Sequence, residues 1–234
     1  MVSFSNLRTT ILAVAAVAIA CSLAVVLARG RSPAASGKTP VPDPAFDEPL
    51  ASSAGTETMV VAGGCFWGVQ AVFQHVKGVV SATSGYAGGT AGTAQYEIVS
   101  SGRTGHAKSI RVTYDPSRIS YGQLLKIFFT VAHDPTQLNE QGPDVGPQYR
   151  SAVFVSDDQQ RRIASAYVEQ LGAAKIFRRP IVTAIDSGHA FYEAEAYHQD
   201  YFTRHPHDPY ILMNDRPKVE ALRRQFPELY VEHK

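Results

Sequence analysis

The stretch from Thr9 to Ala28 runs for twenty residues without a single charged side chain. About 20 consecutive apolar residues are what a helix needs to cross a lipid bilayer. We therefore expect residues 1–29 to form a transmembrane anchor or an export signal. Both alternatives stay open, because Val26-Leu27-Ala28 also suits cleavage after an apolar segment. The globular part of the protein begins further along the chain.

Basic residues stand on both sides of this segment, with Arg8 before it and Arg29 and Arg31 after it. The balance of Lys and Arg sets the orientation of such segments, and here we expect export, with the following domain on the extracytoplasmic side of the membrane. Residues 30–56 are rich in Pro, Ala, Ser and Gly and have few regularly spaced apolar residues. This composition predicts a flexible linker.

The charges are balanced and the cysteines are few. The 22 basic and 21 acidic residues are spread through the sequence and give a formal net charge of +1, so nothing favours nucleic acid as a partner. The two cysteines, Cys21 and Cys65, lie in segments of opposite character. This excludes a disulfide framework and a cysteine-rich zinc site, and we expect neither a metal nor a cofactor.

Residues 57–234 have the pattern of one α+β domain. A short apolar run at 59–62 ends at Gly63-Gly64, and apolar residues at helical spacing follow, which predicts strand, turn and helix. Further strands are expected at 109–114, 151–155 and 181–185, and helices at 121–131 and 157–171. This alternation, with long irregular segments between, predicts a two-layer mixed sheet with packed helices and a ferredoxin-like core.

Cys65 falls at the start of the first of these helices. Cysteine reacts as the thiolate, and a helix N-terminus favours negative charge, so we expect a lowered pKa for Cys65. The alternative is a buried structural thiol, which is the usual state of a free cysteine. Gly63, Gly64 and Gly68 around it indicate a turn that presents the sulfur, so we favour a reactive cysteine.

The run Gly64-Cys65-Phe66-Trp67-Gly68 combines rare residues, and this part of the sequence resembles the A-type methionine sulfoxide reductases. Other motifs follow in the order of that family: GYAGG (85–89), SGRTGHA (101–107), HDPTQ (133–137), QGPDVG (141–146), QYRSA (148–152) and FY to YHQ (191–199). The resemblance covers residues 58–205, nearly the whole domain.

The resemblance implies reduction of methionine (S)-sulfoxide, free or in proteins, with Cys65 as nucleophile. It also implies that Tyr96 and Tyr149 hold the sulfoxide oxygen, with Asp144 behind them. Phe66 and Trp67, next to Gly64, would form the substrate site around the methyl group. These types of residue fit the chemistry, because a sulfoxide offers one polar oxygen that needs donors and is otherwise apolar.

At one position this sequence departs from the family. The family has a glutamic acid after the Gly-His-Ala triplet, whereas here Lys108 follows Gly105-His106-Ala107. Lysine cannot act as a neutral carboxylic acid, but its ammonium has three N–H donors and stabilises a nearby thiolate. Lys108 is therefore included among the catalytic candidates, as a replacement for the family's acid.

Turnover also needs a partner. Many family members have additional cysteines that resolve the sulfenic acid left on the nucleophile, whereas this domain has only Cys65. We therefore expect an outside dithiol, thioredoxin or a periplasmic counterpart, to reduce Cys65, and we expect the protein to act as a monomer.

Two other functions use the same features. One is a membrane-tethered module that binds oxidised methionine with little turnover, a hypothesis that Lys108 motivates. The other is a thiol peroxidase, which would also use one reactive cysteine but has no need of the Phe66-Trp67 methyl pocket.

Overall fold

The structure is a computed structural model and describes residues 41–232. The predicted membrane segment 1–29, with Cys21, and residues 30–40 of the predicted linker lie outside the described residues. Among the residues that are described, no helix is long and apolar enough to cross a membrane.

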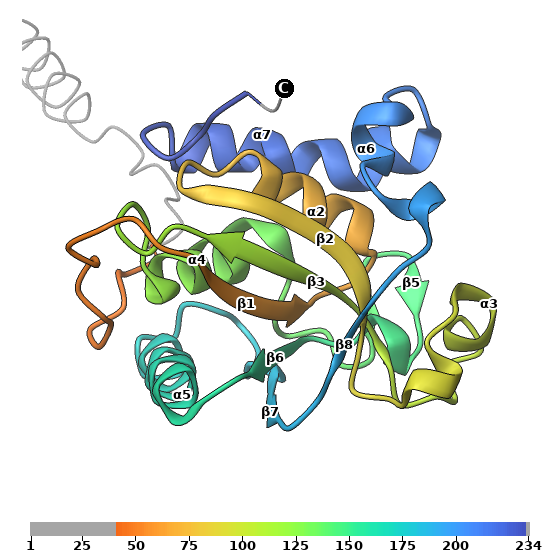
Figure 1. Cartoon of the computed structure of the whole chain (residues 1–234), viewed down its shortest axis with the longest axis horizontal. Coiled ribbons are helices and arrows are strands. Elements are labelled where there is room, and N and C mark those ends of the chain that lie inside the picture. Colours follow the sequence, from red (N-terminus) through yellow and green to blue (C-terminus); the bar gives the residue numbers. More distant parts are fainter. Residues whose placement is uncertain (1–40, 233–234) are drawn as a thin grey trace, which may run out of the picture. The chain divides into compact units, whose positions relative to one another are not determined.

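A six-stranded sheet forms the centre of the domain, with strand order β7-β6-β1-β3-β2-β8 (Figure 1). Neighbouring strands are antiparallel except β6 and β7, which are parallel. The strands are β1 (Glu57–Ala62), β2 (Val79–Ala87), β3 (Ala107–Tyr114), β6 (Ala152–Val155), β7 (Ala184–Ser187) and β8 (Phe191–Glu193), and a separate hairpin joins β4 (Glu140–Gln141) to β5 (Asp144–Val145).

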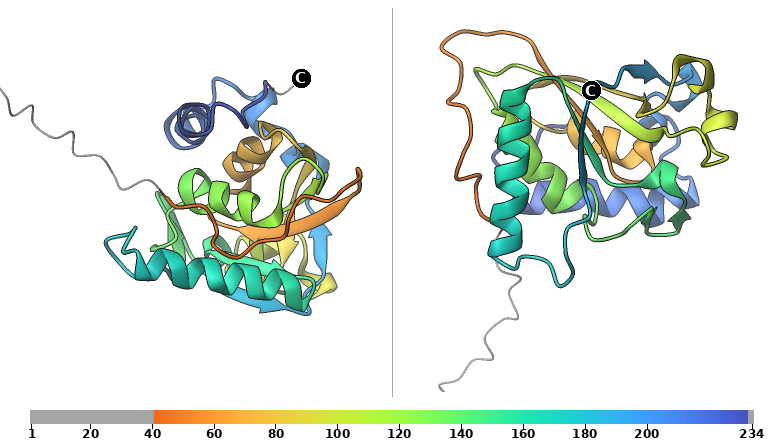
Figure 2. Two further views of the ribbon diagram at one scale, coloured as in Figure 1. Left: turned by 90° about the vertical axis from the view of Figure 1, so that its left-hand side faces the viewer. Right: turned by 90° about the horizontal axis from the view of Figure 1, so that it is seen from below.

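The four longer helices are α2 (Phe66–Gln74), α4 (Tyr121–Ile127), α5 (Asp158–Ala173) and α7 (Arg216–Gln225). The short helices are α3 (Tyr96–Val99) and α6 (Tyr201–Arg204). Two π-helical turns cover Phe128–Ala132 and Ile211–Asp215, and three 3₁₀ turns cover Ala91–Thr93, Pro147–Tyr149 and Ala196–His198. Figure 2 shows α7 beside α2, on the side away from the sheet.

The order of elements is that of a ferredoxin-like core. Along the chain β1, α2, β2, β3, α4 and β6 follow one another, while in the sheet the four strands lie in the order β6-β1-β3-β2. The strand β3 thus separates β1 from β2, as in a split β-α-β unit. The helix α5 then returns the chain to β7, which extends the sheet beyond β6. The predicted α+β fold with a mixed sheet is confirmed.

The core lies between the sheet and the helices, and strand periodicity decides which residues enter it. In β3, Ile110, Val112 and Tyr114 are buried, whereas Arg111 and Thr113 between them are partly exposed. Side chains alternate between the two faces of a strand, so even-numbered residues of β3 face the helices. Lys108 belongs to this even-numbered set, which places a charged residue on the core side.

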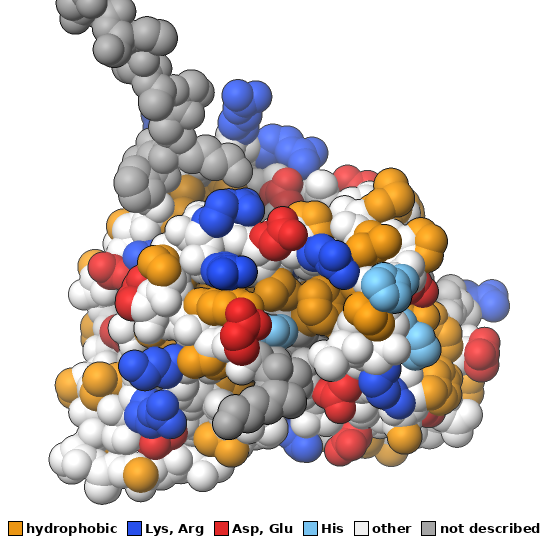
Figure 3. All heavy atoms as spheres, turned by 90° about the horizontal axis from the view of Figure 1, so that it is seen from above, with side chains coloured by type: hydrophobic (Ala, Val, Ile, Leu, Met, Phe, Trp, Pro, Cys, Tyr) orange, Lys and Arg blue, Asp and Glu red, His pale blue; other side chains and the backbone are white. Residues whose placement is uncertain are grey.

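On the surface the charges are mixed. In the face seen in Figure 3, acidic, basic and apolar side chains are interspersed, and no extended patch of one sign is visible. This face therefore offers no charged patch to a highly charged partner.

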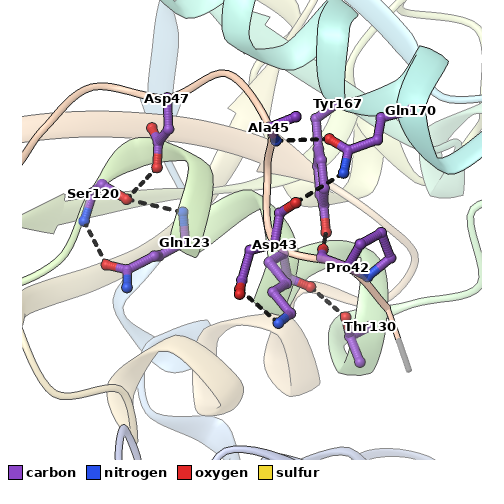
Figure 4. Close-up of polar contacts among 10 residues, drawn as sticks. Pro42, Asp43, Ala45, Asp47, Ser120, Gln123, Thr130, Tyr167 and Gln170 are labelled. Atoms are coloured by element: carbon purple, nitrogen blue, oxygen red, sulfur yellow. Dashed lines mark hydrogen bonds and ion pairs between the residues drawn. The ribbon is translucent and has the colours of Figure 1, made fainter.

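Residues 41–50 form an N-terminal strap that lies against α4 and α5 (Figure 4). The hydroxyl of Tyr167 donates to the Pro42 carbonyl at 2.9 Å, and the amide group of Gln170 donates to the Asp43 carbonyl at 2.8 Å. The same side chain accepts from the Ala45 N–H at 2.8 Å. The structure thus differs from the predicted flexible linker over residues 41–56. Polar contacts with distant residues hold this segment, and hydrophobic periodicity does not reveal such contacts.

Asp47 ties the strap to the first turn of α4. Its carboxylate accepts from the Ser120 hydroxyl at 2.5 Å and from the Gly122 N–H at 2.9 Å. An anion at a helix N-terminus accepts hydrogen bonds from free N–H groups and interacts favourably with the positive end of the helix dipole. Gly122 is required for this contact, because a Cβ atom there would stand 2.5 Å from the Asp47 carboxylate.

We predict that Asp47→Ala lowers the free energy of unfolding by about 1–2 kcal/mol, the usual cost of removing a charged partner from a helix N-terminus. Urea denaturation followed by circular dichroism measures this loss. Asp43→Ala is the control, because Asp43 pairs with Lys126 while its own side chain is 85% exposed, and it should cost less. An equal loss for both variants would contradict a specific role for Asp47.

His133 joins the end of α4 to the sheet. Its Nδ1–H donates to the Phe128 carbonyl at 3.0 Å, and its Nε2 accepts from the Ser151 hydroxyl at 2.7 Å. The imidazole also stacks on the Phe128 ring at 4.0 Å. Both ring nitrogens are therefore used by the neutral form. Burial lowers the pKa of His133 to about 4, and the carbonyl contact opposes this only in part.

This environment predicts a loss of stability in mild acid. Between pH 6.5 and pH 4 the unfolded chain binds a proton at His133 that the folded chain does not, so stability falls as the pH falls through this window, by on the order of 3 kcal/mol. His133→Asn should flatten the dependence of unfolding free energy on pH. The exposed His207, changed to Asn, is the control and should leave the slope as it is.

Candidate active site

A tight turn connects β1 to α2 and carries Cys65. The strand ends at Ala62, the helix begins at Phe66, and Cys65 is the N-cap residue. Gly64 has φ +91°, and a Cβ there would stand 2.5 Å from Gln141. A Cβ at Gly63 would stand 2.8 Å from the His133 ring. The predicted strand, turn and helix are thus observed, and the glycines are needed because neighbouring side chains fill the space.

The Cys65 sulfur is free and buried, with 7% of the residue exposed. Burial raises the pKa of Cys65 to about 12, and the Asp215 carboxylate adds to this rise. The N–H of Trp67 at the helix start and the ammonium groups of Lys218 and Lys108 oppose it. The expectation of a lowered pKa for Cys65 is therefore wrong, because loss of solvent outweighs the effect of the helix N-terminus.

Trp67 lies in a cluster of rings beside Cys65. Its indole stacks on Tyr201 with ring centres 3.7 Å apart and meets the edge of Tyr210 at 6.0 Å. Its Nε1–H donates to Nδ1 of His198 at 3.2 Å. Phe66 is more deeply buried and lies 5.1 Å from the His198 ring. Phe66 and Trp67, the two predicted substrate residues, thus both contact His198. Of the two, only Trp67 is partly exposed.

Lys108 lies among three aromatic rings and is 3% exposed. Its ammonium nitrogen is 4.3 Å from the centre of Tyr96, 4.8 Å from that of Tyr149 and 5.6 Å from that of Phe66. It also donates a hydrogen bond to the Tyr149 hydroxyl at 3.3 Å. Burial acts to lower the pKa of Lys108, but the Tyr149 and Tyr96 hydroxyls and the Cys65 sulfur outweigh it and raise that pKa. Lys108 is therefore a charged donor inside the site.

The remaining candidates come from segments far apart in the sequence. Tyr96 begins α3, and its N–H donates to the Glu195 carboxylate at 2.8 Å. Tyr149 ends the 3₁₀ turn that precedes β6. Asp144 in β5 accepts a hydrogen bond from the Tyr210 hydroxyl. The Lys108 ammonium contacts the rings of Tyr96, Tyr149 and Phe66. Tyr210 contacts both Asp144 and Trp67.

Residues after the last motif complete the site, and the sequence did not reveal them. Tyr201 and Tyr210 enclose Trp67, and Asp215 lies against α2. Their only signal in the sequence is that they are aromatic or acidic, which many surface residues also are. His198 accepts a hydrogen bond from the Trp67 indole N–H. Burial lowers the pKa of His198 to about 4, so this ring is neutral.

The arrangement separates two kinds of surface around one sulfur atom. Aromatic rings from Trp67, Tyr201 and Tyr210 present apolar area, while the Lys108 ammonium and the Tyr149 hydroxyl present donors. A ligand with one oxygen acceptor next to a small apolar group has matching chemistry on both sides.

Comparison with known proteins gives a consistent result. The sequence model of the peptide methionine sulfoxide reductase family matches residues 57–230. The peptide methionine sulfoxide reductase MsrA 2 of Mesorhizobium japonicum is 59% identical over 178 residues, which are 76% of this chain and 91% of that protein. Its namesake from Synechocystis is 50% identical over 190 residues, which cover 80% and 89% of the two chains.

Solved structures agree. Reduced Mxr1 of Saccharomyces cerevisiae has a TM-score of 0.60 at 30% identity and covers 68% of this chain and 94% of its own. Methionine sulfoxide reductase A of Corynebacterium diphtheriae has a TM-score of 0.55 at 34% identity, over 66% and 77% of the chains. With a family match over most of its length and with relatives of this identity, the chain belongs to the peptide methionine sulfoxide reductase family.

Proposed function

We propose that this protein reduces methionine sulfoxide, free and in proteins, to methionine, with Cys65 as the nucleophile. Membership of the family supports the activity. The observation that supports the role of Cys65 is that it precedes Phe66 and Trp67 at the start of α2 and lies close enough to Lys108 for each to affect the pKa of the other. From the family resemblance we assign the S epimer of the sulfoxide.

The reaction transfers one oxygen atom from sulfur to sulfur. The Cys65 sulfur attacks the sulfoxide sulfur, and loss of the substrate's sulfur–oxygen bond gives, in net terms, a Cys65 sulfenic acid and a thioether. The proton of the thiol ends on the transferred oxygen. Two electrons pass from Cys65 to the substrate, and the cysteine is the oxidised product.

A proton donor for the oxygen is needed because the sulfoxide oxygen gains negative charge as its bond to sulfur breaks. We assign this role to the Lys108 ammonium together with the Tyr149 hydroxyl, which are 3.3 Å apart. Donation to the sulfoxide oxygen makes the substrate sulfur more electrophilic and makes loss of the thiol proton easier. Tyr96 and Asp144 support this pair, since Tyr96 packs on Lys108 and Asp144 holds Tyr210 beside Trp67.

Regeneration of Cys65 requires two thiols from outside the domain. One thiol attacks the sulfenic acid, releasing water and forming a mixed disulfide, and a second thiol of the same reductant then releases Cys65. We propose a thioredoxin-like dithiol protein, because Cys65 is the only cysteine among residues 57–234. Capture of a mixed disulfide with a thioredoxin that lacks its second cysteine tests this partner.

We also propose that residues 9–28 attach the domain to a membrane or direct its export. The support is the length of this uncharged segment. Cell fractionation, followed by protease treatment of intact cells, tests both the attachment and the side of the membrane.

We predict that Cys65→Ser abolishes sulfoxide reduction with a chemical dithiol and an oxidised methionine peptide, because a hydroxyl here has no base to activate it. Without reductant, the wild-type protein should gain one oxygen atom at Cys65, detected by mass spectrometry after trapping with a sulfenate probe. Cys21→Ser serves as the control and should be fully active. Residual activity in folded Cys65→Ser would show that Cys65 is not the nucleophile. If the wild-type protein binds the oxidised peptide without turnover, the binding-module hypothesis is favoured.

Lys108 generates a separate prediction. If the ammonium donates to the oxygen, Lys108→Met should lower the rate of the chemical step by at least ~10²-fold, the typical contribution of a positioned acid. Lys108→Glu should remain active with its optimum at lower pH, since a glutamic acid donates only when protonated. Single-turnover rates across pH measure both effects. A loss of only a few-fold in Lys108→Met would show that Lys108 does not donate, and the roles of Tyr96 and Tyr149 would then be tested by Phe substitutions.

A further inference from the structure

Asp215 is the only aspartate or glutamate that is fully buried among residues 41–232. It ends the π-helical turn Ile211–Asp215 and precedes α7. One oxygen, Oδ1, accepts from the Lys218 ammonium at 3.2 Å, whereas Oδ2 is buried without a hydrogen-bond partner in the described part of the chain. A buried carboxylate with an unsatisfied oxygen is costly and calls for an explanation.

The carboxylate lies against the first turn of α2. A Cβ atom at Gly68 would stand 2.1 Å from Asp215 Oδ1 and 2.5 Å from its carboxyl carbon. Any side chain at position 68 would therefore displace this group. Gly68 lies three residues after Cys65, and residues at that spacing are neighbours on one helix face, about 5–6 Å apart at Cβ. This places the carboxylate within about 8 Å of Cys65.

Several charged or polar groups act on the buried sulfur. Lys108 and Lys218 carry positive charge, Asp215 carries negative charge, and Tyr210 donates to the Asp144 carboxylate beside Trp67. After burial itself, Asp215 is the strongest influence that raises the pKa of Cys65. Burial raises the pKa of Asp215, and the Lys218 ammonium at 3.2 Å opposes this rise. A negative charge at this distance in a dry site opposes formation of a second one.

We propose that Asp215 is a positioning residue for the reaction: its buried carboxylate, admitted by the missing side chain at Gly68, acts together with burial to hold the Cys65 sulfur in the thiol form. This proposal rests on the proposed function, in which Cys65 is the nucleophile. The consequence is selectivity. The protonated sulfur reacts slowly with small electrophiles and oxidants, because the thiolate is the reactive form of cysteine.

The test measures alkylation of Cys65 by iodoacetamide as a function of pH in the full-length chain with Cys21 replaced by Ser, so that only Cys65 reacts. Asp215→Asn has nearly the same shape without the charge. It should move the alkylation profile to lower pH by about one unit and raise the rate near pH 7 about tenfold. Glu220→Gln is the matched control, because it neutralises an exposed carboxylate in α7 and should leave the profile unchanged.

A second variant keeps the test decisive if Asp215→Asn does not fold. Gly68→Ala retains the charge but pushes the carboxylate away from α2, and it should move the profile in the same direction. An unchanged profile in a folded Asp215→Asn protein, or a shift to higher pH in either variant, would overturn the proposal. Sulfoxide turnover by the Cys21→Ser protein is measured separately. Its absence would remove the proposed function, while the alkylation profile would still report on Asp215.

Discussion

Between the end of β1 and the start of α2 the chain has room for no side chain except that of Cys65, because His133 lies against Gly63 and Gln141 against Gly64. The central strand β1 holds one end of this turn, and the packed helix α2 holds the other. Cys65 therefore has one position, inside the protein. Every other group of the site is placed relative to this sulfur, and burial of the sulfur decides its chemistry.

Burial makes electrostatic contacts strong, and this gives weight to Lys108, which stands where the family motif has a glutamic acid. Water would screen the Lys108 ammonium, but the rings of Tyr96 and Tyr149 replace that water and leave few partners for its charge. A bound sulfoxide oxygen would be such a partner. The same low exposure gives weight to Asp215, because its charge reaches Cys65 through protein and not through solvent.

Two segments outside the central α+β core complete the domain. The stretch from Glu195 to Asp215 closes the aromatic cluster around Trp67 and brings a carboxylate to α2. The N-terminal strap, residues 41–50, holds α4 and α5 from the outside through Asp47 and Gln170. Individual polar or aromatic contacts hold both segments in place. The periodicity of apolar residues along the sequence does not predict such contacts.

The sequence alone determined the α+β class, the strand–turn–helix around Cys65 and the family, because periodicity of apolar residues and rare motifs such as Gly64–Gly68 are local properties. It also placed Tyr96, Lys108, Asp144 and Tyr149 among the candidates. Only the tertiary structure decided the protonation of Cys65 and the presence of Asp215 beside Gly68. Both depend on burial and on the approach of residues that lie far apart in the chain, such as Gly68 and Asp215, and the order of residues does not show this.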